Sequence, residues 1–93
     1  MVARRRPVCV GREATIAEAS RLMREERVDA VVVTDRLDGK PIPAGIVSAR
    51  DVVTRVVAVG LDPAVITAGD VLSMDDLLQA LPVSIELRRP KVQ

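Results

Sequence analysis

A strand that runs directly into a helix is encoded by residues 45–51, and this corner constrains the fold more than any other part of the chain. Apolar residues before Ser48 favour a strand, while Ser48 and Asp51, three positions apart, form a capping box that starts a helix. The N–H groups of such a first turn have no partners within the helix. Together with Ser48 they would face an anion, and the Asp51 carboxylate would accept from sugar hydroxyls. The corner predicts either a ribose-phosphate site or a helix cap alone.

The composition restricts both the core and the chemistry. A chain of 93 residues, 48% of them hydrophobic and none Phe, Tyr or Trp, forms one domain with an aliphatic core. A purine would therefore lie between aliphatic side chains instead of stacking on an aromatic ring. Without histidine there is no Ser-His-Asp triad, Cys-His pair or histidine metal ligand. We expect no catalytic or metal-binding residues and no enzyme activity.

The single cysteine, Cys9, lies between Val8 and Val10, so we interpret it as a small buried hydrophobic residue. The net charge is +1, from 14 basic and 13 acidic residues that are mixed along the chain. Basic segments at 4–6 and 88–91 are interpreted as solvated tails, so we expect no nucleic-acid partner. With no apolar run of membrane-spanning length and no signal-peptide pattern, we expect no membrane association and a cytoplasmic location.

Apolar periodicity and turn residues predict the secondary structure. Thr15 and Glu18 form a capping box at the start of the first helix. Pro43 lacks an N–H and is expected at the beginning or the unpaired edge of its strand. The predicted order is a strand at 8–10, a helix at 15–27, a strand at 30–33, a turn at 35–41, a strand at 44–47, a helix at 48–59, a capped helical turn at 67–72, a short helix at 74–81 and a strand at 83–87.

The helix at 48–59 is predicted against the β propensity of its valines. Four of them, at 52, 53, 56 and 57, share one helical face, and Gly60 is a suitable residue to end the helix. Helical period and end signals together outweigh a propensity cost of a few tenths of a kcal/mol per residue. We interpret this valine face as core or as a dimer surface, since an exposed apolar patch predicts association.

This order of strands and helices, with these motifs, resembles a CBS domain over residues 7–73. The resemblance implies an α+β fold, a β-α-β-β-α repeat whose small sheet is packed on one side by two helices. It divides the chain into a single repeat with a basic N-terminal tail, residues 1–73, and a divergent tail at 74–93 in place of a second repeat. The motifs that carry it are residues 14–19, 28–33, 45–51, 60–63 and 69–72.

The family implies a regulatory module that binds an adenosine-containing ligand such as AMP, ADP, ATP or S-adenosylmethionine between two repeats. By motif, Asp51 would bind the ribose hydroxyls, and Ser48 the phosphate or the ribose. Backbone groups near Ala30 would meet the adenine, Ile46 would form an apolar wall, and Arg50 would lend positive charge to a phosphate. These five residues are the ligand-binding residues that the resemblance implies.

Two departures from the family pattern shape the remaining expectations. A second repeat is missing, so we expect an obligate homodimer in which two chains supply the two halves; the alternative is a truncated pair whose tail covers the gap. Asp29 occupies a position where some relatives place a basic residue, and its carboxylate would disfavour ATP relative to AMP. The regulated protein is then a separate, unidentified chain. The alternative is a ligand-free dimerisation or protein-interaction module with the same fold.

Overall fold

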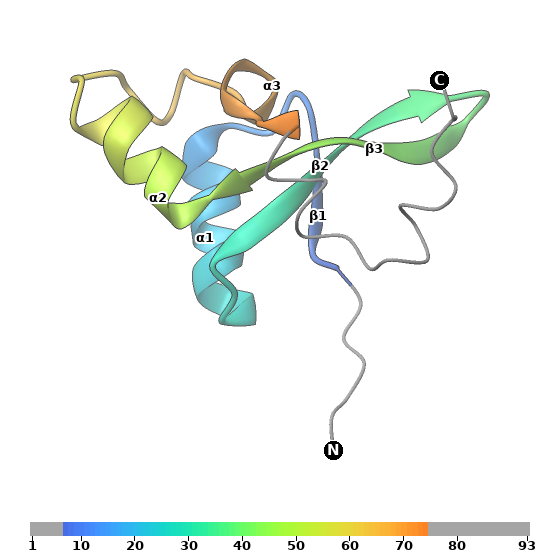
Figure 1. Cartoon of the computed structure of the whole chain (residues 1–93), viewed down its shortest axis with the longest axis horizontal. Coiled ribbons are helices and arrows are strands. Elements are labelled where there is room, and N and C mark those ends of the chain that lie inside the picture. The colour runs from blue at the N-terminus through green and yellow to red at the C-terminus, as the bar shows by residue number, and fades with distance from the viewer. Residues whose placement is uncertain (1–6, 75–93) are drawn as a thin grey trace.

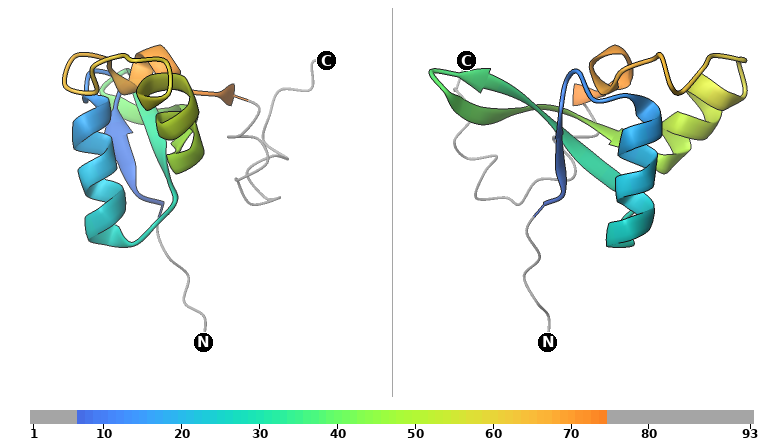
Figure 2. Two further views of the ribbon diagram at one scale, coloured as in Figure 1. Left: turned by 90° about the vertical axis from the view of Figure 1, so that its left-hand side faces the viewer. Right: turned by 180° about the vertical axis from the view of Figure 1, so that it is seen from behind.

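Three strands and two main helices form a two-layer fold in the computed structural model, which describes residues 7–74 (Figure 1). Strand β2 (Ala30–Leu37) is central, with β1 (Cys9–Gly11) parallel to it on one side and β3 (Lys40–Ser48) antiparallel on the other. Helix α1 (Ile16–Glu26) and the helix that follows β3 lie on the same side of this sheet (Figure 2). The predicted fold class, with both helices on one face, is confirmed.

Helix α1 begins and ends where its sequence signals predict. The N–H of Glu18 donates to Thr15 Oγ1 at 3.1 Å, and the N–H of Thr15 donates to Glu18 Oε1 at 2.9 Å. At the other end Arg27 adopts a left-handed conformation with φ of 59°, and the N–H of Val28 donates to the Met23 carbonyl at 3.0 Å. The capping box and the apolar periodicity therefore predict both ends of this helix to within one residue.

The two longer strands extend beyond the predicted strands at 30–33 and 44–47. They continue into a hairpin whose two turn residues, Asp38 and Gly39, have φ values of 53° and 79°. Positive φ at both positions matches the twist of the flanking strands and makes a two-residue turn. The predicted turn at 35–41 was thus too long, because its polar residues are the exposed ends of paired strands.

Pro43 lies inside β3, which is at the edge of the sheet. It faces Thr34, directly after a register shift at Val33 that leaves a bulge in β3. A proline is tolerated there because an edge strand and a bulge both relieve the need for its missing N–H. Of the two positions predicted for Pro43, the beginning of its strand or the edge of the sheet, the structure has the edge.

The second main helix consists of α2 (Ala49–Asp51) and η1 (Val52–Val57), which is wound with i to i+5 hydrogen bonds. The N–H of Ala58 accordingly donates to the Val53 carbonyl at 2.8 Å. Gly60, with φ of 81°, ends the helix as predicted. A short helix, α3 (Ala68–Val71), follows, and its capping box confirms the helical turn predicted there.

The core lies between the sheet and the helices and is aliphatic, as the composition predicts. Its buried members come from every layer: Ile16, Ala19, Met23, Val31, Val33, Val47, Val56, Ala68 and Val71. Of the four valines expected on one helical face, Val52 and Val56 pack here, whereas Val53 and Val57 are exposed. The predicted stripe is therefore divided between the core and the surface.

The prediction that Cys9 is buried is wrong, because its side chain is exposed. Its neighbours Val8 and Val10 pack against the core, and alternation along the strand turns Cys9 to the opposite face. Within residues 7–74 no helix is long and apolar enough to cross a membrane. The predicted elements after Met74 and both basic segments lie outside the described residues.

Candidate functional site

The strand-to-helix corner closes on itself through two reciprocal hydrogen bonds. The N–H of Asp51 donates to Ser48 Oγ, and the N–H of Ser48 donates to Asp51 Oδ2, each at 3.0 Å. Both side chains are partly buried, so the capping box has formed in full. Among the described residues, Asp51 Oδ1 and the hydroxyl hydrogen of Ser48 are not used by the cap. The corner can therefore accept one hydrogen bond and donate another while the cap remains intact.

The N–H groups of this first turn are less available than the sequence predicts. The N–H of Ala49 donates to the Asp29 carbonyl at 2.7 Å, and that of Asp51 is held by Ser48. Within residues 7–74, the N–H of Arg50 is the one donor of the first three without a partner. The expectation that several free amides face an anion is corrected, because the carbonyl of Asp29, the residue before β2, occupies one of them. The corner provides few backbone donors for a polyphosphate.

Register places three of the predicted site residues on one face of the sheet. Ala30 pairs with Ser48, and Val32 pairs with both Ile46 and Cys9. Paired residues project to the same side of a sheet, and the intervening residues project into the core. We call the side that carries Cys9, Ala30, Val32, Ile46 and Ser48 the outer face. It lies opposite α1 and combines aliphatic side chains with the polar corner.

The backbone around Ala30 is open on one side. Strand β1 pairs with β2 from Val32 onward, so among the described residues no strand pairs with Ala30 on that side. Ile46 is buried at 6% exposure, and its backbone exchanges two hydrogen bonds with Ser73, at 3.0 and 2.8 Å. The chain after α3 thereby runs along the outer edge of β3, next to the corner. Ala30 can offer backbone groups to a ligand, while Ile46 offers only its side chain.

Charged side chains flank the corner on both sides. Arg50 is exposed one residue before Asp51, and Asp29 is exposed one residue before Ala30. Arg50 is free to turn toward a phosphate near Ser48, whereas the Asp29 carboxylate opposes additional negative charge. All five predicted site residues thus lie at or beside the same corner. Sequence reasoning missed Val32 and Cys9 as outer-face residues, although strand alternation around Val31 and Val33 was a usable signal.

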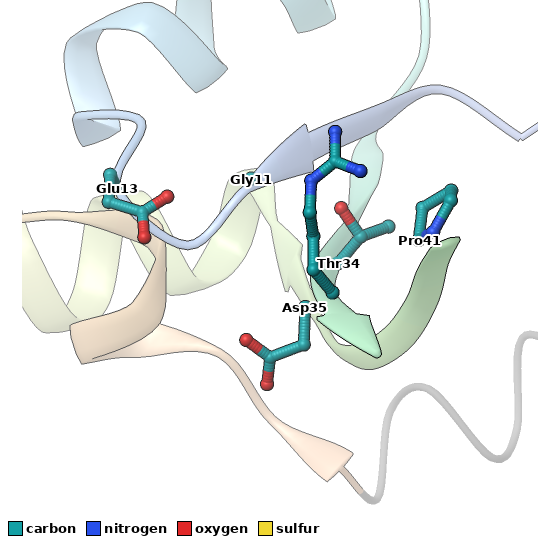
Figure 3. A pocket seen from close by; sticks show the side chains of 6 residues that line it. Gly11, Glu13, Thr34, Asp35 and Pro41 are labelled. Atoms are coloured by element: carbon teal, nitrogen blue, oxygen red, sulfur yellow. The ribbon is translucent and has the colours of Figure 1, made fainter. Parts of the chain in front are cut away.

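A separate hollow of about 550 Å³ lies toward the hairpin and includes none of the predicted site residues (Figure 3). Pro41 on its rim is seven residues from Ser48 along β3, or about 23 Å. The nearby ion pair joins Arg12 Nε to Asp35 at 3.0 Å, with the two side chains 43% and 44% exposed. Such an exposed pair contributes at most about 1 kcal/mol. The lining residues are Gly11, Glu13, Thr34, Asp35, Arg36 and Pro41.

No group of three or more Cys, Asp or Glu side chains within residues 7–74 is arranged to hold a metal ion. Buried side-chain polar atoms in this part of the chain all have hydrogen-bond partners. The chemistry offered by the described residues is therefore hydrogen bonding at the corner and apolar contact on the outer face.

Known proteins match both the sequence and this fold. Residues 2–58 match the CBS-domain family model. The Meiotically up-regulated gene 70 protein of Schizosaccharomyces pombe is 44% identical over 57 residues, which are 61% of this chain and 7% of that protein. The chain therefore spans less than a tenth of this curated relative.

Two solved structures share the fold and more than a quarter of the aligned sequence. A CBS domain protein from Pyrobaculum aerophilum, complexed with AMP, is 33% identical with a TM-score of 0.67, covering 77% of this chain and 53% of that one. A hexameric CBS-CP12 protein from bloom-forming cyanobacteria is 31% identical with a TM-score of 0.64, covering 73% and 39%. Together with the matched residues and the strand order, these similarities show that the chain belongs to the CBS-domain family, whose domains are regulatory modules.

Proposed function

We propose that this chain binds an adenosine-containing ligand at the corner formed by Ser48 and Asp51, in a cleft between two copies of the chain. The observation that carries the proposal is the placement of Ala30, Ile46 and Ser48 on one sheet face, beside Asp51. A polar corner next to an aliphatic surface suits a ribose joined to a purine. The AMP complex of the Pyrobaculum aerophilum relative supports the same ligand class.

Each residue has a role that its surroundings allow. Asp51 Oδ1 accepts from the ribose hydroxyls while Oδ2 continues to hold the cap. The Ser48 hydroxyl donates to the phosphate or the ribose, because its oxygen already accepts from the N–H of Asp51. Backbone groups of Ala30 bind the adenine edge, Ile46 packs against the ring, and Arg50 neutralises a phosphate.

The corner favours a ligand with one phosphate over a ligand with three. Within the described residues Ala49 and Asp51 have already committed their N–H groups, which leaves Arg50 as the main source of positive charge. Asp29 adds a carboxylate on the other side. AMP is accordingly expected to bind more tightly than ATP, and S-adenosylmethionine, which lacks phosphate, is the third candidate.

A second copy completes the site. The family works with two repeats around the ligand, and the outer face carries aliphatic side chains that are only partly buried, among them Ala30 and Val32. Pairing two outer faces about a two-fold axis would bury these side chains and enclose two equivalent corners. The assembly is a cytoplasmic homodimer that acts on a separate, unidentified protein.

Ultraviolet absorption tests the ligand directly, because the chain has no Phe, Tyr or Trp to absorb near the adenine band. A purine band in the purified protein, released into the filtrate after denaturation, supports the proposal, and mass spectrometry identifies the ligand. AMP added at about a hundred times its Kd should stabilise the fold by about 2.7 kcal/mol. No retained purine, together with an unchanged Tm in AMP, ATP and S-adenosylmethionine, would contradict it.

The alternative is a ligand-free dimerisation module, and one observation favours it. The cap between Ser48 and Asp51 is complete without any ligand, so both residues already have a structural role. Under this alternative the two chains associate, and adenosine compounds change neither the Tm nor the association.

A further inference from the structure

The outer face is shielded at β3, although no described helix lies on it. Both main helices pack on the opposite side of the sheet (Figure 2). Ile46 projects to the outer face and is only 6% exposed, yet it does not belong to the core cluster. Its neighbours in register are less shielded, since Val32 is half-buried and Cys9 is exposed. The shielding therefore begins at β3, where the chain arrives from α3, and decreases toward β1.

The chain reaches this face through Ser73. The backbone of Ser73 pairs with that of Ile46, so Ser73 extends the row across the sheet that Cys9, Val32 and Ile46 form. Met74, the next residue, is helical and 50% exposed. The segment that follows therefore leaves from the edge of the outer face.

The sequence of this segment predicts an amphipathic helix. Its apolar side chains are at positions 74, 77, 78 and 81, which is the spacing of one helical face. Asp75, Asp76 and Gln79 belong to the other face, and Pro82 is expected to end the helix. So short a helix is stable only when its apolar face packs against another element. The outer face, with its aliphatic side chains, is the nearest such surface.

We propose that residues 74–81 pack as a helix on the outer face of their own chain and keep the ligand site closed until they are displaced. Three strand spacings of about 4.8 Å separate Ser73 from β1, a distance of about 14 Å. Eight helical residues span about 12 Å, so the helix covers Ile46 and Val32 and ends beside the exposed thiol of Cys9. The same chain is favoured over a second copy, because a directly joined segment has an effective concentration in the millimolar range.

The inference rests on the proposed function, because the covered surface is the one that meets the adenine. Ile46 cannot pack against a purine ring while it is 6% exposed, so the ligand binds only after the cover has moved. The helix also occupies the surface on which a second copy would pair. AMP then binds to the fraction of chains whose helix is displaced, and its apparent Kd is raised by the inverse of that fraction. A protein that captures the displaced helix would strengthen AMP binding by the same coupling.

A second cysteine tests the contact, because Cys9 is the one cysteine of the chain. Leu81→Cys places a thiol on the apolar face at the end of the helix, and Gln79→Cys places one on the polar face. In dilute protein without AMP, oxidised glutathione should join Leu81→Cys to Cys9 within one chain, which then moves faster in non-reducing electrophoresis. Gln79→Cys should give little of this product. No intrachain disulfide in Leu81→Cys, equal yields in the two variants, or disulfides only between chains would overturn the inference.

Two glutamate variants at neighbouring positions test the closing role. Leu78→Glu puts a charge on the apolar face and should displace the helix, whereas Gln79→Glu puts the same charge on the polar face. Titration calorimetry should show about 10-fold tighter AMP binding by Leu78→Glu if the helix covers about nine-tenths of wild-type chains, and wild-type affinity for Gln79→Glu. Unchanged or weaker binding by Leu78→Glu, in chains that circular dichroism shows to be folded, would overturn the closing role. If neither variant nor the wild type binds AMP, the proposed function fails, while the disulfide yields still decide whether the helix packs on the face.

Discussion

Leu72 lies directly over Gly45, so closely that a Cβ atom at position 45 would be 2.7 Å from Leu72 Cδ1 and 3.0 Å from its Cβ. The contact brings the chain after α3 onto β3, next to the hydrogen bonds between Ile46 and Ser73. Gly45 begins the corner motif, and its missing side chain is what allows this approach. The glycine is therefore required by packing, since its φ is not in the left-handed region.

Gly45→Ala is expected to destabilise the domain by about 1–3 kcal/mol, because the new methyl group displaces the base of the Leu72 side chain. In a small domain this lowers the Tm by about 4–8 °C per kcal/mol. Gly11→Ala is the matched control, since its Cβ would meet nothing closer than 3.5 Å. Thermal unfolding followed by circular dichroism compares the two. Equal Tm values for both variants would show that Leu72 does not pack on Gly45.

Val56→Ala tests the division of the valines in the second helix. Val56 is fully buried, so its truncation leaves a cavity and should cost about 2 kcal/mol. Val65→Ala, at a residue that is 67% exposed, should change stability by less than about 0.5 kcal/mol. Urea unfolding measures both. A smaller loss for Val56→Ala than for Val65→Ala would mean that the helix turns a different side to the sheet.

Cys9 reports whether the outer face is covered in solution. Its thiol is exposed in the single chain and shares a face with Val32 and Ile46. If outer faces pair, the rate of reaction with a disulfide reagent should fall as protein concentration rises, and recover on dilution. The denatured chain gives the unprotected rate. A native rate that equals it at every concentration would exclude pairing through this face.

Much of the fold could be predicted because local signals agree with each other. Thr15 with Glu18 and Ser48 with Asp51 are reciprocal caps read from sequence alone, and each starts a helix where expected. The strand lengths could not be predicted, since the paired residues around Asp38 and Gly39 are mostly exposed and mix polar side chains with Leu37, Pro41 and Ile42. Hydrophobic patterning carries no signal where a hairpin extends beyond the core.

The candidate site was harder to predict because tertiary contacts modify it. The carbonyl of Asp29 accepts a hydrogen bond from the N–H of Ala49. The two residues are 20 positions apart, so no local sequence pattern reveals this contact. Cys9 was misjudged because its two valine neighbours suggested burial on both faces of a strand that has only one face in the core. The π-helical winding that separates Val53 from Val56 has no sequence signature of its own.

Ser48→Ala separates the cap from the ligand contact. Loss of the hydroxyl removes the acceptor for the N–H of Asp51 and should cost about 1 kcal/mol of stability. Ser48→Gly keeps most of that stability and still lacks the hydroxyl. If Ser48 binds the ligand, both variants should weaken AMP binding while only the alanine variant lowers the Tm appreciably. Wild-type affinity in both would remove Ser48 from the site.

The most direct test of the ligand site is the AMP affinity of Asp51→Asn, measured by titration calorimetry beside Asp70→Asn. Asp70 has the same capping position in α3, where its Oδ2 accepts from the N–H of Thr67 at 3.1 Å, but it does not lie on the corner. Loss of a charged hydrogen bond to the ribose should weaken AMP binding by about 10- to 100-fold in Asp51→Asn. Asp70→Asn should bind AMP as the wild type does. Wild-type affinity in Asp51→Asn, or no AMP binding by the wild type, would contradict the proposed site.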